Sequence, residues 1–177
     1  MSVLIAVVAL FCVLGVVNLL LCIGIIRRLR EHTELLGAQS GSAAARPPMR
    51  AVGEVVGPFE ANTVDGTAVG SALLTDTTVV GVFSPGCGPC KERLPLFIEH
   101  AATRDRDRVL AVVAGSQEDS ADYVAQLTPV ALVVREDDGG PVTTALGVQG
   151  FPSFALLDAD GTVLASGITL DALTVPA

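Results

Sequence analysis

Three short charge-free runs, rich in branched aliphatic residues, constrain the fold of this chain more than any other feature. They are Thr77–Phe83 (TTVVGVF), Val109–Ala114 (VLAVVA) and Val130–Val134 (VALVV). Such runs are typical of strands that are buried on both faces of a sheet. Two helix-like segments, Cys87–Ala102 and Asp119–Leu127, separate them, and Ser116 is a candidate cap for the second. The alternation predicts an α/β fold with a central mixed sheet flanked by helices on both faces.

Two Asp-Gly pairs predict hairpins near the ends of this region. Asp65-Gly66 lies in the middle of the segment Phe59–Val69, and Asp160-Gly161 separates Phe154–Leu157 from Thr162–Ser166. Asp-Gly between short strand-like segments is a strong hairpin signal. A short helix is expected over Pro141–Leu146. The acidic run Glu136-Asp137-Asp138 is interpreted as a solvated loop.

An apolar segment precedes this region. Residues 3–26 contain no charge, and about 20 apolar residues are enough to cross a bilayer as a helix. A cleavable signal peptide is the alternative, but the segment lacks a basic start and an A-x-A site, and it is long for such a peptide. We therefore predict one N-terminal transmembrane helix through residues 3–26, within an anchor and helical extension at 1–36. A linker at 37–50 and a folded domain at 51–177 follow.

Charge divides the chain at the same place. Residues 1–50 hold five Arg and two Glu, a net +3, whereas the rest holds six Lys and Arg against seventeen Asp and Glu, a net −11. Nucleic-acid binding requires a basic surface, so we expect no nucleic-acid partner. The uncharged apolar segment at residues 3–26 has the lipid bilayer as its expected partner.

Only two of the four cysteines are candidates for chemistry. Cys12 and Cys22 lie inside the predicted anchor and are interpreted as small apolar residues. Cys87 and Cys90 form a CxxC motif, which occurs in redox pairs, in zinc sites and in structural disulfides. Zinc needs four ligands, but no third cysteine lies outside the anchor. A disulfide that closes so short a loop constrains the unfolded chain little. A redox pair without a metal or other cofactor is favoured.

The expected location of the pair explains how it would act. Cys87 follows a strand through a Ser-Pro-Gly loop and should lie where a helix begins. The first turn of a helix has unpaired N–H groups and a partial positive charge, and both stabilise a thiolate, the nucleophile of disulfide exchange. Cys90 lies one helical turn later. We therefore expect Cys87 to attack a disulfide and Cys90 to resolve the mixed disulfide that forms.

These residues resemble a known family. Cys87-Gly-Pro-Cys90-Lys91, followed by Pro95, is similar to the active site and kinked first helix of thioredoxins. The loop from Val148 to Ser153 is similar to the thioredoxin loop that carries a cis proline facing the cysteines. The resemblance implies a thioredoxin-like fold and a cis peptide bond before Pro152. The site residues it implies are Cys87, Cys90 and Pro152 in catalysis, with Gly88, Pro89 and Phe151 in substrate binding.

The anchored arrangement resembles membrane-tethered thiol-disulfide oxidoreductases of the TlpA type, especially the MauD-like branch within the redoxin and AhpC/TSA superfamily. The resemblance implies client protein disulfides as substrates and a membrane electron-transfer partner. Two positions depart from the pattern: Gly81 and Arg93 stand where relatives place an acidic residue. Glu92 is then a weak candidate for the general base.

Two other functions stay open at this stage. A thiol-dependent peroxidase is one, although Val80 and Ser84 stand where the peroxidatic motif has proline and threonine. A non-catalytic assembly module for a partner enzyme is the other. The Gly-Pro pair between the cysteines resembles thioredoxin, whose potential is about −270 mV, so reduction of clients is favoured over oxidation.

The side of the membrane is subject to two opposing arguments. Arg27, Arg28 and Arg30 follow the predicted span directly, and the positive-inside rule would place the folded domain in the cytoplasm. The resemblance implies the opposite side, where protein disulfides form and need editing. We expect a single-pass cell-membrane protein with an extracytoplasmic catalytic domain, because the implied function requires disulfide substrates.

Overall fold

The computed structural model describes Met1, Leu14, residues 47–74 and residues 76–173. Among these residues, no helix is both long and apolar enough to cross a membrane. The segment predicted as an anchor, with Cys12 and Cys22, lies outside the described residues apart from Leu14. The chain divides into two units, and the second begins at Pro47, four residues before the boundary expected at 51. The difference arises because Met49 is buried in the core of the second unit.

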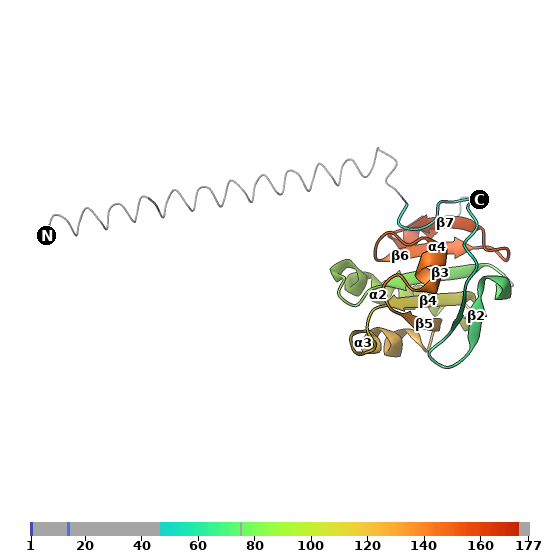
Figure 1. The fold of residues 1–177 in the computed structure, drawn as a ribbon, viewed down its shortest axis with the longest axis horizontal. Coiled ribbons are helices and arrows are strands. Elements are labelled where there is room, and N and C mark those ends of the chain that lie inside the picture. The colour runs from blue at the N-terminus through green and yellow to red at the C-terminus, as the bar shows by residue number, and fades with distance from the viewer. Residues whose placement is uncertain (2–13, 15–46, 75, 174–177) are drawn as a thin grey trace. The chain divides into compact units, whose positions relative to one another are not determined.

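The second unit is built on a five-stranded mixed sheet whose strands lie in the order β5-β4-β3-β6-β7 (Figure 1). β3 is parallel to β4 and β4 to β5, whereas β6 pairs antiparallel with both β3 and β7. The strands are β3 (Thr78–Phe83), β4 (Val109–Ala114), β5 (Leu132–Glu136), β6 (Ser153–Leu157) and β7 (Val163–Gly167). The three apolar runs of the sequence therefore form three adjacent strands.

The third of these strands begins two residues later than the sequence suggested. Val130 and Ala131 both donate their N–H groups to the Leu127 carbonyl, so these residues end the preceding helix in a turn. β5 therefore starts at Leu132 rather than at Val130. The predicted helices are present as α2 (Gly88–Ala101), α3 (Gln117–Leu127) and α4 (Pro141–Leu146). Ser116 caps α3, because its Oγ accepts the Asp119 N–H at 3.3 Å.

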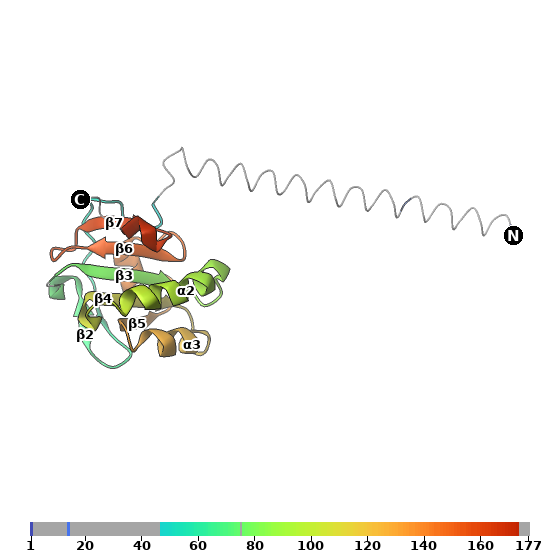
Figure 2. The same ribbon diagram turned by 180° about the vertical axis from the view of Figure 1, so that it is seen from behind.

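Helices cover both faces of the sheet and create two separate apolar cores. α4 lies over the face seen in Figure 1, and α2 and α3 lie over the opposite face, seen in Figure 2. Side chains alternate between the cores along each central strand: in β3, Val79 and Phe83 face α2, whereas Val80 and Val82 face α4. The last described element, η3 (Leu170–Leu173), is a short 3-10 helix.

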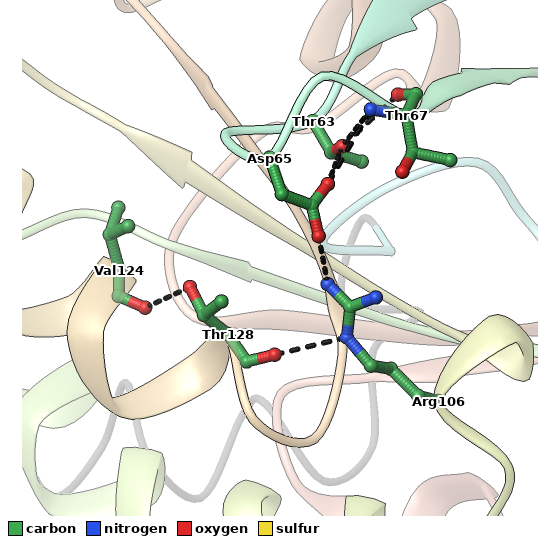
Figure 3. A network of polar contacts seen from close by, with 6 residues as sticks. All are labelled: Thr63, Asp65, Thr67, Arg106, Val124 and Thr128. Carbon is green, nitrogen blue, oxygen red and sulfur yellow. Dashed lines mark hydrogen bonds and ion pairs between the residues drawn. The ribbon is translucent and has the colours of Figure 1, made fainter.

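The first predicted hairpin is also present, as β1 (Glu60–Asn62) and β2 (Ala68–Gly70), followed by η1 (Ser71–Leu73). Its turn is attached to the large sheet, since the Val64 N–H donates to the Val133 carbonyl of β5 at 2.8 Å. Arg106, in η2 (Arg106–Arg108), pairs with Asp65 of the turn and donates to the Thr128 carbonyl after α3 at 3.0 Å (Figure 3). The network joins three segments that are distant in the sequence.

The interpretation of the acidic run as a solvated loop was wrong for Glu136. Glu136 is buried, and its carboxylate accepts the N–H groups of Val142 at 3.0 Å and Thr143 at 2.7 Å, in the first turn of α4. Negative charge is favourable there because the unpaired N–H groups point at it. Asp137 and Asp138 are exposed, as expected.

Candidate redox site

The two cysteines lie where β3 leads into α2. The loop that joins this strand to this helix sets the local geometry. The Cys87 N–H donates to the Ser84 carbonyl at 3.1 Å, which closes a turn after the strand. Cys87 is the N-cap of α2, and its sulfur accepts the Cys90 N–H at 3.2 Å. Pro89 is tolerated in the first turn because N–H groups there have no helical partner. The Cys87 sulfur therefore lies at the N-terminus of α2, hydrogen-bonded to a backbone N–H of its first turn.

The two sulfurs differ in exposure. Both cysteines are free thiols, but Cys87 is partly exposed, whereas Cys90 is fully buried. Burial, reinforced by the hydrogen bond with Cys87, raises the pKa of Cys90 to about 12. Cys90 therefore keeps its proton at neutral pH, and only Cys87 is accessible to a disulfide from outside. This asymmetry supports the predicted roles of attacker and resolver.

The loop before β6 lies against Cys87. The Phe151–Pro152 peptide bond is cis, as the resemblance implied, and the Cys87 thiol donates to the Phe151 carbonyl at 3.4 Å. Phe151 is partly buried and Pro152 buried. This geometry brings together residues 64 positions apart and places the cis-proline loop beside the Cys87 sulfur. Gly88 and Pro89, the other predicted substrate contacts, are exposed at the start of α2.

Two residues that position this loop were not found from the sequence. The Ser153 hydroxyl donates to the Gly150 carbonyl at 2.6 Å and to the Pro48 carbonyl at 3.1 Å. Pro48 also accepts the Gln149 N–H at 2.7 Å. The segment at the start of the folded unit thus holds both sides of the cis-proline loop. No local signal reveals this contact, because it joins residues about a hundred positions apart.

The absence of an acid at Gly81 has a packing cause. A Cβ atom on Gly81 would lie 2.5 Å from Cε2 of Phe97, well inside van der Waals contact. Phe97 is fully buried, so its ring occupies the space that a side chain at position 81 would need. Arg93 is partly exposed and Glu92 exposed on α2. Glu92 therefore supplies no buried carboxylate near Cys90. Within the described ranges, no group of three or more His, Cys, Asp or Glu could hold a metal ion.

Two buried hydroxyl groups on α3 also escaped the sequence analysis. Ser120 and Tyr123 are both buried on α3, and neither hydroxyl has a hydrogen-bond partner. The predicted helix placed them three residues apart, hence on one face. Which face the helix turns toward the sheet depends on packing, so the sequence pattern alone did not distinguish them from ordinary core residues.

Comparisons with known proteins agree with this geometry. Residues 47–171 match the Redoxin family. The chain is 31% identical over 98 residues to the thiol:disulfide interchange protein CycY of Rhizobium leguminosarum bv. viciae, a match that covers 53% of this chain and 50% of CycY. The chain thus spans about half the length of this curated relative.

Two solved structures are similar in fold. One is the thioredoxin domain of a thiol-disulfide oxidoreductase from Bacteroides vulgatus, with a TM-score of 0.56, 19% identity and coverage of 70% of this chain and 93% of that one. The other is a secreted Mycobacterium tuberculosis disulfide oxidoreductase homologous to E. coli DsbE, with a TM-score of 0.51, 20% identity and coverage of 66% and 87%. At these identities the similarity shows a shared thioredoxin-like fold.

Proposed function

The chain belongs to the redoxin family, and on that premise we propose that it is a membrane-tethered thiol-disulfide oxidoreductase that reduces or exchanges disulfides of client proteins. One observation carries the proposal. A partly exposed thiol caps a helix, a buried thiol follows one turn later, and a cis-proline loop lies against the first sulfur. The name of the relative CycY, a thiol:disulfide interchange protein, supports the same reaction.

The reaction would proceed in two steps. In the first, the Cys87 thiolate attacks a client disulfide, a Cys87–client bond forms, and one client sulfur leaves and takes a proton. In the second, Cys90 loses its proton and attacks Cys87, which releases the other client thiol and leaves a Cys87–Cys90 disulfide. The backbone of Phe151 and Pro152 would hold an extended client segment beside Cys87. Two electrons pass to the client, and a dithiol donor must then restore the pair.

Insulin reduction tests the proposal directly. With dithiothreitol as the electron donor, the protein should accelerate insulin precipitation, and Cys87→Ser should reduce the rate to that of dithiothreitol alone. Cys90→Ser should accumulate a mixed disulfide that mass spectrometry detects. Ser84→Ala is a control that alters the same loop without removing a sulfur. Unchanged turnover in Cys87→Ser would exclude the proposed function, and rapid peroxide consumption instead would favour a peroxidase.

We further propose that residues 3–26 cross the membrane and that the enzyme belongs to the TlpA/MauD-like branch, with a membrane protein supplying or receiving electrons. The uncharged 24-residue segment and the acidic folded unit support this arrangement. Alkaline carbonate extraction should leave the full chain in the membrane pellet. Release of the full chain into the supernatant would contradict the tether.

The catalytic domain is proposed to lie on the extracytoplasmic side, since protein disulfides are formed and edited there. The basic residues after the predicted span, Arg27, Arg28 and Arg30, argue for the other orientation. A reporter fused after Ala177 distinguishes the two. Alkaline phosphatase, which needs disulfides, should be active in this fusion, whereas a fluorescent protein that folds only in the cytoplasm should be dark.

A further inference from the structure

A short segment at the start of the folded unit lies against the loop that contacts Cys87. We call this segment, residues 48–50, the N-terminal strap. The sequence pattern places these residues in a linker, yet Met49 is only 1% exposed and packs in the apolar core on the α4 side of the sheet. The strap is therefore part of the folded unit rather than of the linker.

One carbonyl oxygen of the strap contacts both ends of the cis-proline loop. The Pro48 oxygen accepts the Gln149 N–H at 2.7 Å and the Ser153 hydroxyl at 3.1 Å. A carbonyl oxygen has two lone pairs, so these two bonds use its full capacity. Ser153 is 0% exposed, and its hydroxyl also lies 2.6 Å from the Gly150 carbonyl oxygen. The strap thus holds the residues that flank the loop on either side.

The strap is itself attached to the end of α4. The Arg50 N–H donates to the Leu146 carbonyl at 3.0 Å, and the Arg50 Nε donates to the Ala145 carbonyl at 2.8 Å. Both carbonyls belong to the last turn of the helix, where carbonyl groups have no partner within the helix and arginine is a favourable donor. Movement of the strap would therefore break bonds to α4 as well as bonds to the loop.

The loop that the strap holds is in direct contact with the reactive sulfur. The Phe151 carbonyl accepts the Cys87 thiol at 3.4 Å, and Phe151 directly follows Gly150, whose carbonyl binds Ser153. Hydrogen bonds weaken steeply when their distance and angle depart from the preferred values. An extended client segment that binds the loop backbone would therefore be held beside Cys87 only while the loop keeps this position.

We propose that Ser153 and the N-terminal strap position the cis-proline loop for client capture. The segment that joins the fold to the proposed tether is then part of the redox site. Ser153 is a positioning residue, because its hydroxyl contacts the loop and the strap and leaves the reacting sulfurs to other groups. The inference rests on the proposed disulfide exchange and identifies what sets the geometry of its client-binding loop.

Two disulfides of different size test the positioning role. The reduced full chain, with Cys12→Ala and Cys22→Ala so that only the pair reacts, is mixed with one of two oxidants. One is the disulfide dimer of a short extended peptide, which needs the loop backbone, and the other is dithiobisnitrobenzoate, which needs only an exposed sulfur. In Ser153→Ala, the second-order rate constant for the peptide should fall about fivefold, the equivalent of one hydrogen bond. The rate constant for dithiobisnitrobenzoate should stay within about twofold.

A second variant weakens the strap from outside the core. Arg50 is partly exposed, so Arg50→Ala removes the bond to the Ala145 carbonyl without opening a buried cavity. It should lower the peptide rate constant by a smaller factor, about two- to threefold, and leave the dithiobisnitrobenzoate rate constant unchanged. If Ser153→Ala does not fold, Arg50→Ala decides the question by the same two rate constants.

Thr78→Val is the matched control. Thr78 is buried at the start of β3, and its hydroxyl donates to the Asp76 carbonyl at 3.1 Å. The substitution removes one buried hydroxyl bond of the same kind at the other end of β6, because Thr78 pairs with Leu157, the last residue of that strand, whereas Ser153 is its first. Both rate constants should equal those of the unaltered protein.

Amide hydrogen exchange, followed by NMR, measures the hold of the strap on the loop. The Gln149 N–H donates to Pro48, so its exchange should be about fivefold faster, or more, in Ser153→Ala. The Val64 N–H, which donates to the Val133 carbonyl at the edge of the sheet, is the reference and should be unaffected. Equal acceleration of both amides would indicate a general loss of stability and contradict a local positioning role.

Three results with the two disulfides would overturn the proposal: an unchanged peptide rate constant in the folded strap variants, equal slowing with both disulfides, or the same slowing in Thr78→Val. Insulin reduction by the unaltered chain tests the proposed function separately. If insulin is reduced but Ser153→Ala keeps the full peptide rate constant, the positioning role is wrong and the oxidoreductase stands. If the unaltered chain does not reduce insulin, the proposed function itself fails.

Discussion

Replacing Gly81 with alanine should destabilise the protein by about 1–3 kcal/mol, the usual cost of overpacking a core. The added Cβ would lie 2.5 Å from Cε2 and 2.7 Å from Cζ of Phe97, and 3.1 Å from Cε2 of Phe83. Ordinary carbon contacts are about 3.5–4.0 Å, so the overlap with the Phe97 ring approaches 1 Å. Either that ring or strand β3 has to move.

The Phe97 ring has little freedom to withdraw. It is fully buried, stacks on Phe154 with centroids 5.8 Å apart, and meets Phe83 edge-on at 5.3 Å. Shortening the ring to leucine should therefore relieve the overlap. We expect the double variant Gly81→Ala/Phe97→Leu to lose less stability than the sum of the two single variants, by about 0.5–1 kcal/mol or more.

Urea unfolding of the full chain, followed by far-UV circular dichroism, measures the four stabilities of this cycle. Gly86→Ala is the matched control, since a Cβ there meets no atom within 4 Å and should change stability by less than about 0.5 kcal/mol. Gly81→Asp has the same Cβ and should be at least as destabilising as Gly81→Ala. If Gly81→Ala is as stable to urea as Gly86→Ala, the packing explanation for the missing acid is wrong. It is also wrong if the loss of stability in the double variant equals the sum of the losses in the two single variants.

Three further predictions concern the cysteines and two carboxylates. Iodoacetamide at pH 7 should label Cys87 and spare Cys90, and labelling of Cys90 should rise only as pH approaches its pKa of about 12; equal labelling rates by mass spectrometry would contradict the burial argument. The Thr63 hydroxyl and the Arg106 guanidinium hold the pKa of Asp65 well below its ordinary value of 3.8, so its stabilisation is present above about pH 4 and is lost as pH falls. Asp65→Asn should thus lower Tm at pH 7, with the difference from the unaltered protein shrinking below pH 4, whereas a constant difference would show that ionisation is irrelevant. Glu136→Ala should cost about 2–3 kcal/mol in urea unfolding, because two N–H groups of α4 lose a buried charged acceptor; an effect as small as that of the exposed Asp138→Ala would refute this role.

Elements whose signals are local were predicted well. Side chains of β3 and β4 alternate between two cores. Because both faces of the sheet are covered, nearly every side chain of these strands is buried, and a continuous apolar run in the sequence indicates this. The two Asp-Gly turns form hairpins because glycine accepts the positive φ that such turns need, +85° at Gly66 and +77° at Gly161. Ser116 caps α3 by accepting the N–H of Asp119, three residues later. In each case the partner lies close along the chain.

Elements whose signals depend on distant partners were not predicted. Glu136 looked solvated because its neighbours are acidic, yet α4 folds back over its carboxylate. The cis-proline loop is held by Pro48, which the sequence analysis had placed in a linker. Ser120 and Tyr123 look like ordinary helix residues in the sequence, yet the packing of α3 buries both hydroxyls. None of these contacts produces a periodic pattern in the sequence from which it could be predicted.

The sequence by itself determined the class of fold and the candidate reactive atoms, because hydrophobic period, turn residues and the Cys87–Cys90 spacing are properties of neighbouring residues. The tertiary structure alone decided how those atoms differ. It buried Cys90 and left Cys87 partly exposed, filled the space at Gly81 with the Phe97 ring, and buried two hydroxyls of α3. Burial and the choice of hydrogen-bond partner depend on which distant segments pack together, and that packing establishes the environment that sets the chemistry of each thiol.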